Sequence, residues 1–307
     1  MNSYGKFIFI FVMLFTLIFV TTGRASACFQ QEPAQEEDES KGLMPKSFVA
    51  NRPAPKKERV SKPRPVQTKK VVYRRISKPL NKPKAAKTEM ASIGFTVWKR
   101  KPMNLNNTKG IAENRAGAAQ ISVPEYERVN SETPLAVGEN IQITIESLTH
   151  KGFLYIIDRE KYADGTYSTP KIIYPLRGRG NYVNPGILKS TGVFDIVAPA
   201  LNKQQVEEVF TVIISPNALV PAERLLGGII EFEPSKFNEW ANKWNAEVEV
   251  IEQETGAGEI MTDEETKGIQ ENRQLTQDDP APLTVYRSYI NRGDAILMNF
   301  HLKFKSA

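Results

Sequence analysis

The sequence predicts a mainly β protein: an antiparallel β-sandwich-like domain with two accessory helices, preceded by a signal peptide and a disordered tether. Apolar residues are concentrated after about residue 92, where short runs of alternating apolar and polar residues recur. Clusters of Gly, Pro, Asn and Asp separate these runs, as turns separate strands. Before residue 92, a short apolar segment leads into a long charged stretch that is rich in proline.

Residues 1–27 have the features of a secretory signal peptide. Lys6 precedes an apolar run over residues 7–20, and small residues follow up to Ala27. The apolar run has about fourteen residues, fewer than the roughly twenty of a membrane-spanning helix. We therefore expect cleavage between Ala27 and Cys28 and export of the mature chain. An uncleaved N-terminal helix that anchors the chain in a membrane is the alternative.

Cys28 is the only cysteine of the chain. An internal disulfide, a thiolate metal cluster and a Cys-x-x-Cys redox pair are therefore excluded. As the first residue after cleavage, Cys28 is a candidate for lipidation, which would attach the protein to a membrane. Arg24 and Ala25 differ from the residues usual before a lipidated cysteine, so plain secretion is the alternative. Export also argues against a nucleic-acid partner.

Residues 28–91 are expected to form a disordered tether, acidic at first and then basic and rich in Pro and Lys. Few large apolar residues are available to offset the roughly 1–2 kcal/mol per residue that backbone ordering costs. The prolines favour an extended polyproline II conformation, which suits a spacer. The alternative is that the lysines and arginines bind an anionic lipid or wall polymer. Because this basic stretch accounts for the net charge of +6, the rest of the chain is net acidic.

Residues 92–307 are predicted to form the β-rich domain. Asp164 and Gly165 lie between two strand-like runs and predict a hairpin turn. The last run alternates regularly, which predicts a C-terminal strand with one face in the core. The predicted strands cover residues 93–98, 141–146, 152–157, 171–174, 193–197, 206–214, 248–251, 283–290 and 296–304.

Two helices are expected to interrupt the strands. The first follows Ser235 and places Phe237, Trp240 and Trp244 on one face. The second begins at Thr262, where the pattern Thr-x-x-Glu is typical of a capping box. Few apolar residues follow, so we expect this second helix to lie at the surface.

Motifs for catalysis or cofactor binding are not evident. The chain lacks a Gly-x-Ser-x-Gly elbow and a phosphate-binding Gly-x-x-x-x-Gly-Lys loop. Its two histidines, His150 and His301, lie at predicted surface positions, and no calcium-loop spacing is present. We therefore expect no enzyme activity, no cofactor and no bound metal. The alternative is an enzyme in which Asp158, Glu160 and Asp164 converge with Arg159.

Residues suited to ligand contact lie close together in the middle of the chain. Tyrosine offers a large contact area with a polar tip, and charged side chains orient a ligand. Packing and turn formation are the alternative roles for the same residues. The predicted ligand surface consists of Tyr155, Asp158, Arg159, Glu160, Tyr162, Asp164, Arg177 and Arg179.

The segment from Gly152 to Gly165, followed by residues 172–175, resembles a bacterial family described as domain of unknown function 4384. The resemblance extends from residues 94–98 to residues 284–287 and covers nearly all of the predicted domain. It implies an exported bacterial protein with a β-rich domain, and no activity comes with the family. We therefore expect a non-enzymatic binding or scaffold module that is periplasmic, membrane-attached or secreted. Its expected partner is an unidentified envelope protein or polymer.

Overall fold

The protein is mainly β, with two antiparallel sheets and two helices, as the sequence predicted. The predicted signal peptide, with Ala27 and Cys28, lies outside the described residues. Within the described part of the chain, no helix is long and apolar enough to cross a membrane. The computed structural model describes residues 49–50, 52–54, 72–81, 88–101, 125–176, 180–197, 203–227, 229–263, 265–267 and 274–305.

The first sheet consists of β1 (Tyr73–Arg75), β2 (Thr88–Arg100), β3 (Tyr126–Val129), β4 (Asn140–Ser147), β8 (Leu188–Ser190), β9 (Phe194–Asp195), β12 (Val248–Gln253) and β13 (Thr284–Asn291). Its strand order is β1-β12-β13-β2-β4-β8, with β3 paired to β2 and β9 paired to β4. The central strands β13, β2 and β4 are long and antiparallel. Their outer face carries the site described below.

The second sheet consists of β5 (Gly152–Tyr162), β6 (Lys171–Tyr174), β7 (Tyr182–Val183), β10 (Gln205–Ser215), β11 (Ile230–Glu231) and β14 (Ile296–Lys303). Its strand order is β11-β6-β5-β10-β14, with β7 paired to β5. The predicted hairpin joins β5 to β6, and its turn contains Asp164 and Gly165. The last strand, β14, pairs along its whole length with β10, so the C-terminal strand belongs to the sheet as expected.

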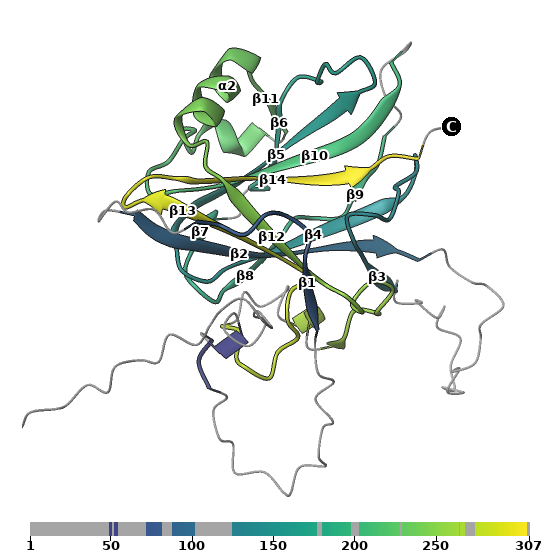
Figure 1. Ribbon diagram of the computed structural model, residues 1–307. Coiled ribbons are helices and arrows are strands. Elements are labelled where there is room, and N and C mark those ends of the chain that lie inside the picture. Colours follow the sequence, from purple (N-terminus) through teal and green to yellow (C-terminus); the bar gives the residue numbers. More distant parts are fainter. Residues whose placement is uncertain are drawn as a thin grey trace, which may run out of the picture. The chain divides into compact units, whose positions relative to one another are not determined.

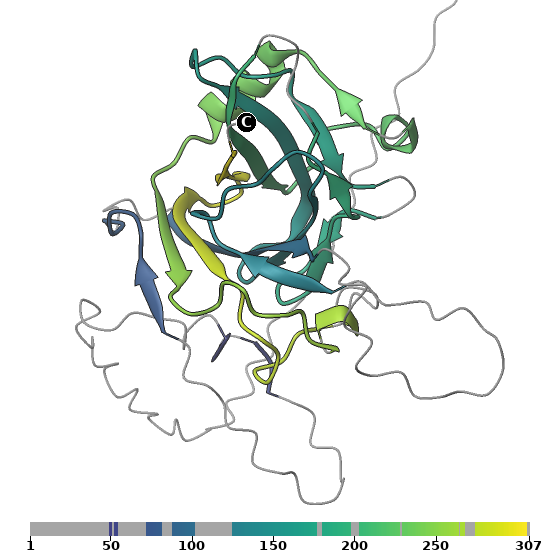
Figure 2. The same cartoon turned by 90° about the vertical axis from the view of Figure 1, so that its right-hand side faces the viewer.

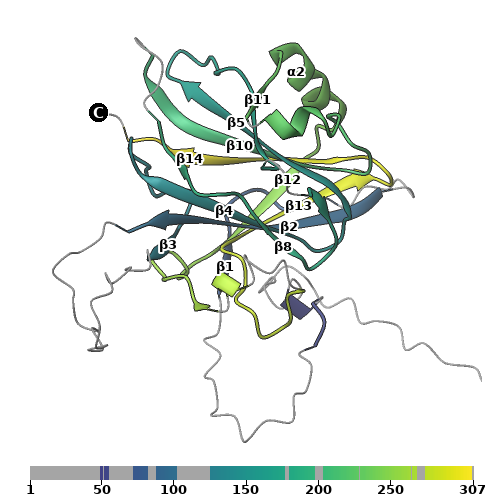
Figure 3. The same cartoon turned by 180° about the vertical axis from the view of Figure 1, so that it is seen from behind.

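Three layers result from the alternation of side chains along the strands (Figure 1). Leu154 and Ile156 of β5 face the first sheet and join the main core between the sheets. Tyr155 and Ile157 point the opposite way, towards helix α2 (Pro234–Lys243). The side view shows the strands curving around a common interior, which the main core fills (Figure 2). Seen from behind, α2 lies on the far side of the second sheet from β2, β4 and β8 (Figure 3).

Both predicted helices are present at their expected places. Helix α2 begins at Pro234, so Ser235 lies inside the helix and is not its cap. Proline suits the first helical position. Glu233 is the cap residue, and its side chain forms no capping hydrogen bond. Phe237 and Trp240 are buried against the second sheet. At the second helix, Thr262 and Glu265 form the predicted capping box, with hydrogen bonds of 2.9 and 3.2 Å. Residues 268–273, where the predicted helix continues, lie outside the described residues.

The tether prediction is wrong for three stretches before residue 92. β2 begins at Thr88, so the predicted boundary falls inside a strand. β1 completes the first sheet by pairing with β12, and Tyr73 donates a hydrogen bond to the carbonyl oxygen of Pro282 at 2.7 Å. Arg52 is 3% exposed. Main-chain pairing and a buried ion pair order these stretches, although they supply little apolar surface.

Candidate functional site

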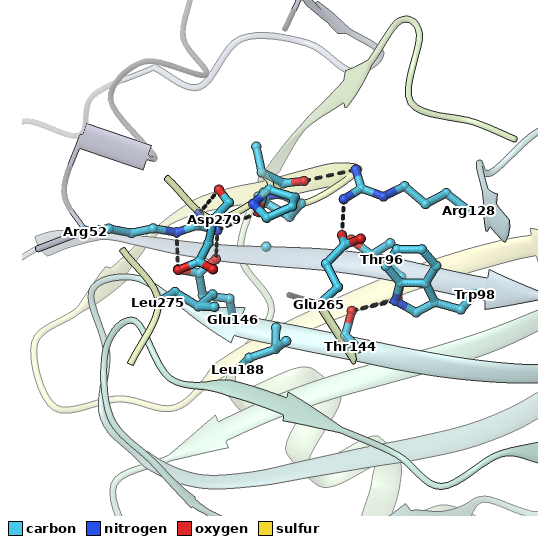
Figure 4. Close-up of a pocket in the computed structure, with 14 residues that line it drawn as sticks. Arg52, Thr96, Trp98, Arg128, Thr144, Glu146, Leu188, Glu265, Leu275 and Asp279 are labelled. Atoms are coloured by element: carbon cyan, nitrogen blue, oxygen red, sulfur yellow. Dashed lines mark hydrogen bonds and ion pairs between the residues drawn. The ribbon is translucent and has the colours of Figure 1, made fainter. Parts of the chain in front are cut away.

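A pocket lined by charged, hydroxyl and apolar side chains lies on the outer face of the first sheet (Figure 4). Because Phe95 and Val97 of β2 point into the main core, Thr96 and Trp98 point outwards. On β4, Thr144 and Glu146 line the same face. All four outward side chains are buried, since residues 275–282, Glu265 and two arginines cover them.

Arg52 fills one end of this pocket. Its side chain and that of Glu146 are 1% and 2% exposed, and the two form a bidentate ion pair with N–O distances of 2.9 and 2.6 Å. The other N–H groups of Arg52 donate to the carbonyl oxygens of Thr276, Asp279 and Pro280. Burial raises the pKa of the Glu146 carboxyl, and the Arg52 guanidinium opposes that rise. The positive charge of Arg52 and the negative charge of Glu146 therefore compensate each other.

The carbonyl groups around Arg52 belong to a turn that is stabilised by hydrogen bonds between its own residues. Asp279 accepts hydrogen bonds from the backbone N–H and the hydroxyl of Thr276, at 2.7 and 3.0 Å. The Asp279 N–H in turn donates to the Thr276 carbonyl oxygen at 3.2 Å. Side-chain to backbone bonds of this kind fix local turns. The turn is thus positioned by its own residues to present carbonyl oxygens to a cation.

Arg128 occupies the other end of the pocket. It forms an ion pair with Glu265, the residue that also caps the second helix, and donates to the Ala281 carbonyl oxygen at 3.1 Å. Its guanidinium lies 5.1 Å from the centre of the Trp98 ring. Trp98 donates its indole N–H to the Thr144 hydroxyl at 3.1 Å. Arg128 therefore connects the capped helix to the outer face of β2 and β4.

The remaining free space in this pocket is small. Its volume is about 30 Å³, enough for about one or two water molecules and far below the roughly 300–1,000 Å³ of small-molecule sites. Arg52, which belongs to the N-terminal part of the chain, is one of the residues that line and close this space.

The predicted ligand residues do not share one surface. Tyr155 lies in the core beneath α2, where its hydroxyl oxygen accepts a hydrogen bond from the Leu219 N–H at 3.0 Å. Asp158, Glu160 and Tyr162 lie on the opposite face of β5, and Asp164 lies in the exposed turn with Lys203. Arg159 points to the outer face of the second sheet. Arg177 and Arg179 lie outside the described residues.

Asp158 and Glu160 form a carboxyl cluster with Glu208 of β10. Glu208 lies directly opposite Glu160 in the ladder and is hydrogen-bonded to Asp158. Burial and then the Asp158 charge raise the pKa of Glu208 to about 10, and burial also raises the pKa of Asp158. Tyr162 donates to Glu160 at 2.8 Å, and Lys171 is a nearby cation. At neutral pH Glu208 therefore keeps a proton, which it shares with Asp158.

This shared proton makes stability depend on pH. The pKa of Glu208 is higher in the folded protein than the ordinary value near 4.3, so the folded state holds the proton more tightly. The resulting stabilisation is fully present below about pH 4 and is lost as the pH rises towards 10. Between pH 6 and 9, this proton lowers the free energy of unfolding by at most about 1.4 kcal/mol for each unit of pH increase.

We expect Glu208→Gln to remove this part of the pH dependence, because glutamine offers Asp158 a donor and has no acidic proton to lose. Urea unfolding at pH 6, 7.5 and 9 measures the slope. Glu239→Gln, at a position whose side chain is 61% exposed, is the control and should leave the slope unchanged. Equal slopes for wild type and Glu208→Gln would contradict the shared proton.

Arg159 has an unusual environment on the outer face of the second sheet. Its guanidinium lies between two rings, 4.5 Å from the centre of Tyr167 and 3.8 Å from that of Phe237. Burial lowers its pKa, but an arginine stays charged at neutral pH. Its Nε is buried without a hydrogen-bond partner. Among the described carboxylates, none forms an ion pair with Arg159.

Metal binding finds no support in the described part of the chain, where no group of His, Cys, Asp and Glu is arranged to hold an ion. His150 and His301 each contact a glutamate, Glu89 at 3.0 Å and Glu207 at 2.9 Å. His301 is exposed at the surface as expected, whereas the His150 side chain is only 14% exposed.

Sequence reasoning missed the pocket residues Arg52, Arg128, Glu146 and Glu265. Arg52 was hidden in a stretch whose composition predicts disorder. Glu146 and Thr144 looked like the solvated face of a strand, which is the usual meaning of such alternation. One signal was available: Trp98 lies on that same face, and a tryptophan there indicates that something covers it.

Comparison with known proteins adds no relative. No family model, no curated protein and no solved structure matches the chain.

Proposed function

We propose that the protein is a non-enzymatic binding or scaffold module of the bacterial cell envelope, exported by its N-terminal signal. The apolar run over residues 7–20 and the small residues before Cys28 support export. Asp164 in the exposed turn and Arg159 on the outer face lie apart from the cluster of Asp158 and Glu160, which supports a role other than catalysis. Its ligand is an anionic group of the envelope, a carboxylate or a phosphate.

The guanidinium of Arg159 is the observation that carries this proposal. Stacking on Tyr167 and Phe237 orients the group and removes water from its faces. Arg159 as a whole is half-buried and has no described carboxylate partner, so the part of its guanidinium other than the buried Nε is suited to bind an anion. Tyr167 is 43% exposed, so the stack is open to solvent on that side. A carboxylate or phosphate group can therefore approach Arg159.

We expect Arg159→Ala to weaken binding of the full-length mature protein to purified cell-wall sacculi and envelope membranes by at least about tenfold, since a charge-assisted hydrogen bond contributes roughly 1.5–3 kcal/mol. Cosedimentation measures the binding, and circular dichroism melts confirm that the variant is folded. Arg292→Ala is the matched control, because it removes the same charge at a side chain that is 84% exposed. Its binding should equal that of wild type.

The outcome that contradicts the proposal is unchanged binding by folded Arg159→Ala. Binding that survives this change but disappears when residues 56–71 are deleted would also contradict it. That result would assign the contact to the basic residues of the tether, whose binding would fall steeply with salt.

A further inference from the structure

The pocket around Arg52 offers a hydrogen-bond acceptor to every N–H donor of the guanidinium group. A guanidinium has five N–H donors in a fixed plane, and each of those of Arg52 has an acceptor. Glu146 takes two of them, and the carbonyl oxygens of Thr276, Asp279 and Pro280 take the other three. A lysine ammonium has only three donors and cannot satisfy this set. The site therefore discriminates in favour of arginine.

The acceptors all come from the domain and not from the segment that carries Arg52. Glu146 is fixed by its place in β4, and the turn from Thr276 to Asp279 is held by its own hydrogen bonds. Both arrangements have hydrogen bonds that do not involve Arg52. The acceptor set is thus pre-formed, which is the property of a receptor site rather than of a local salt bridge.

The pocket also recognises the backbone on both sides of the arginine. The Gln277 side-chain amide donates to the carbonyl oxygens of Ala50 and Arg52, at 3.2 and 3.1 Å, and the Gln277 N–H donates to the Pro53 carbonyl oxygen at 3.2 Å. Ala50 and Pro53 are exposed, so Arg52 is the side chain that anchors the segment. The acceptor at Pro53 is its backbone carbonyl oxygen, and the proline ring fixes the backbone angle of that residue.

We propose that this pocket is a peptide-binding site for an arginine followed by a proline, and that Arg52–Pro53 is its exchangeable intramolecular occupant. The same pair recurs in the chain as Arg64–Pro65. The site can therefore be filled by either pair of its own chain or by an Arg-Pro segment of another protein. Exchange of Arg52 for Arg64 would add twelve residues to the segment between Cys28 and the pocket. This inference is independent of the role of Arg159.

The test uses the full-length mature protein with Arg52→Ala and Arg64→Ala, so that neither internal pair competes. The probe is a fluorescent peptide with the sequence of residues 47–56, and fluorescence anisotropy measures its binding. We expect saturable binding to the variant and at least tenfold weaker binding to wild type, whose pocket is occupied. A peptide with lysine in place of the arginine should bind at least tenfold more weakly, as should a receptor that also carries Glu146→Gln.

Three results would overturn the inference: no saturable binding to the folded variant, equal binding of the lysine peptide, or binding that Glu146→Gln leaves unchanged. If the alanine variant is not folded alone, recovery of its near-ultraviolet circular dichroism with excess peptide supports the site. Failure to recover counts against it. Arg52→Lys with Arg64→Ala keeps the positive charge and provides a second receptor for the same titration.

Discussion

Replacing Arg52 with alanine is expected to lower the free energy of unfolding by about 3–5 kcal/mol. The change leaves the Glu146 carboxyl, with a side chain 2% exposed, without its cation. The carbonyl oxygens of Thr276, Asp279 and Pro280 lose the hydrogen bonds from Arg52 at the same time, although Thr276 keeps the one from the Asp279 N–H. Burial already raises the pKa of Glu146. Without Arg52, a charged carboxylate at this position would be buried without a cation, which costs free energy. The loss is large for one residue in a stretch whose composition predicts disorder.

Urea unfolding of the full-length mature protein at pH 7, followed by circular dichroism, measures this effect. Arg292→Ala removes the same charge at an exposed position and should change stability by no more than about 0.5 kcal/mol. A loss below about 1 kcal/mol for Arg52→Ala would mean that the N-terminal segment contributes little to the fold.

Gly152→Ala is expected to destabilise the fold by about 3 kcal/mol through a backbone clash. Gly152 begins β5, and a Cβ atom there would lie 2.4 Å from the carbonyl oxygen of Ser215 and 2.9 Å from its carbonyl carbon. Ser215 is paired with Phe153 in the ladder between β10 and β5. Relief of the clash therefore requires the two central strands of the second sheet to separate at this point.

Gly180→Ala is the matched control for this substitution. Nothing lies within 4 Å of a Cβ atom at Gly180, and its backbone is outside the left-handed region. We expect a change of at most about 0.5 kcal/mol, so thermal melts should separate the two variants clearly. Equal melting temperatures for the two alanine variants would contradict the close approach of β5 and β10.

Strand periodicity was enough to predict most of the fold. In the last strand, Ile296, Met298 and Phe300 lie at alternate positions, and this pattern places them in the main core. The spacing of Phe237 and Trp240 likewise predicted the buried face of α2. Both predictions depend on residues that are close in sequence. Local periodicity encodes this information directly.

The outer-face pocket could not be predicted in this way. Arg52 and Glu146 are 94 residues apart, and nothing in either local pattern points to the other. The composition of residues 28–91 predicts disorder because few apolar residues are present, yet a bidentate ion pair and one short strand order parts of that stretch. A prediction of disorder from composition depends on the number of apolar residues. It does not include the stabilisation from one arginine whose N–H groups all have acceptors.

The predicted ligand surface failed as one unit for a reason that the sequence already contained. Neighbours in a strand point to opposite faces, so Arg159 cannot share a face with Asp158 or Glu160. Arg159 packs against Tyr167 and Phe237 on the outer face of the second sheet, and we propose it alone as the ligand contact. Clustering in the sequence of a strand is therefore weak support for a common surface.

A double-mutant cycle on Arg52 and Glu146 tests most directly whether the N-terminal segment is held in the domain. Unfolding free energies are measured for wild type, Arg52→Ala, Glu146→Ala and the double variant. We predict a coupling energy of about 2–3 kcal/mol, with the double variant far less destabilised than the sum of the two single changes. Additive effects, with coupling below about 0.5 kcal/mol, would contradict the Arg52–Glu146 contact on which this account depends.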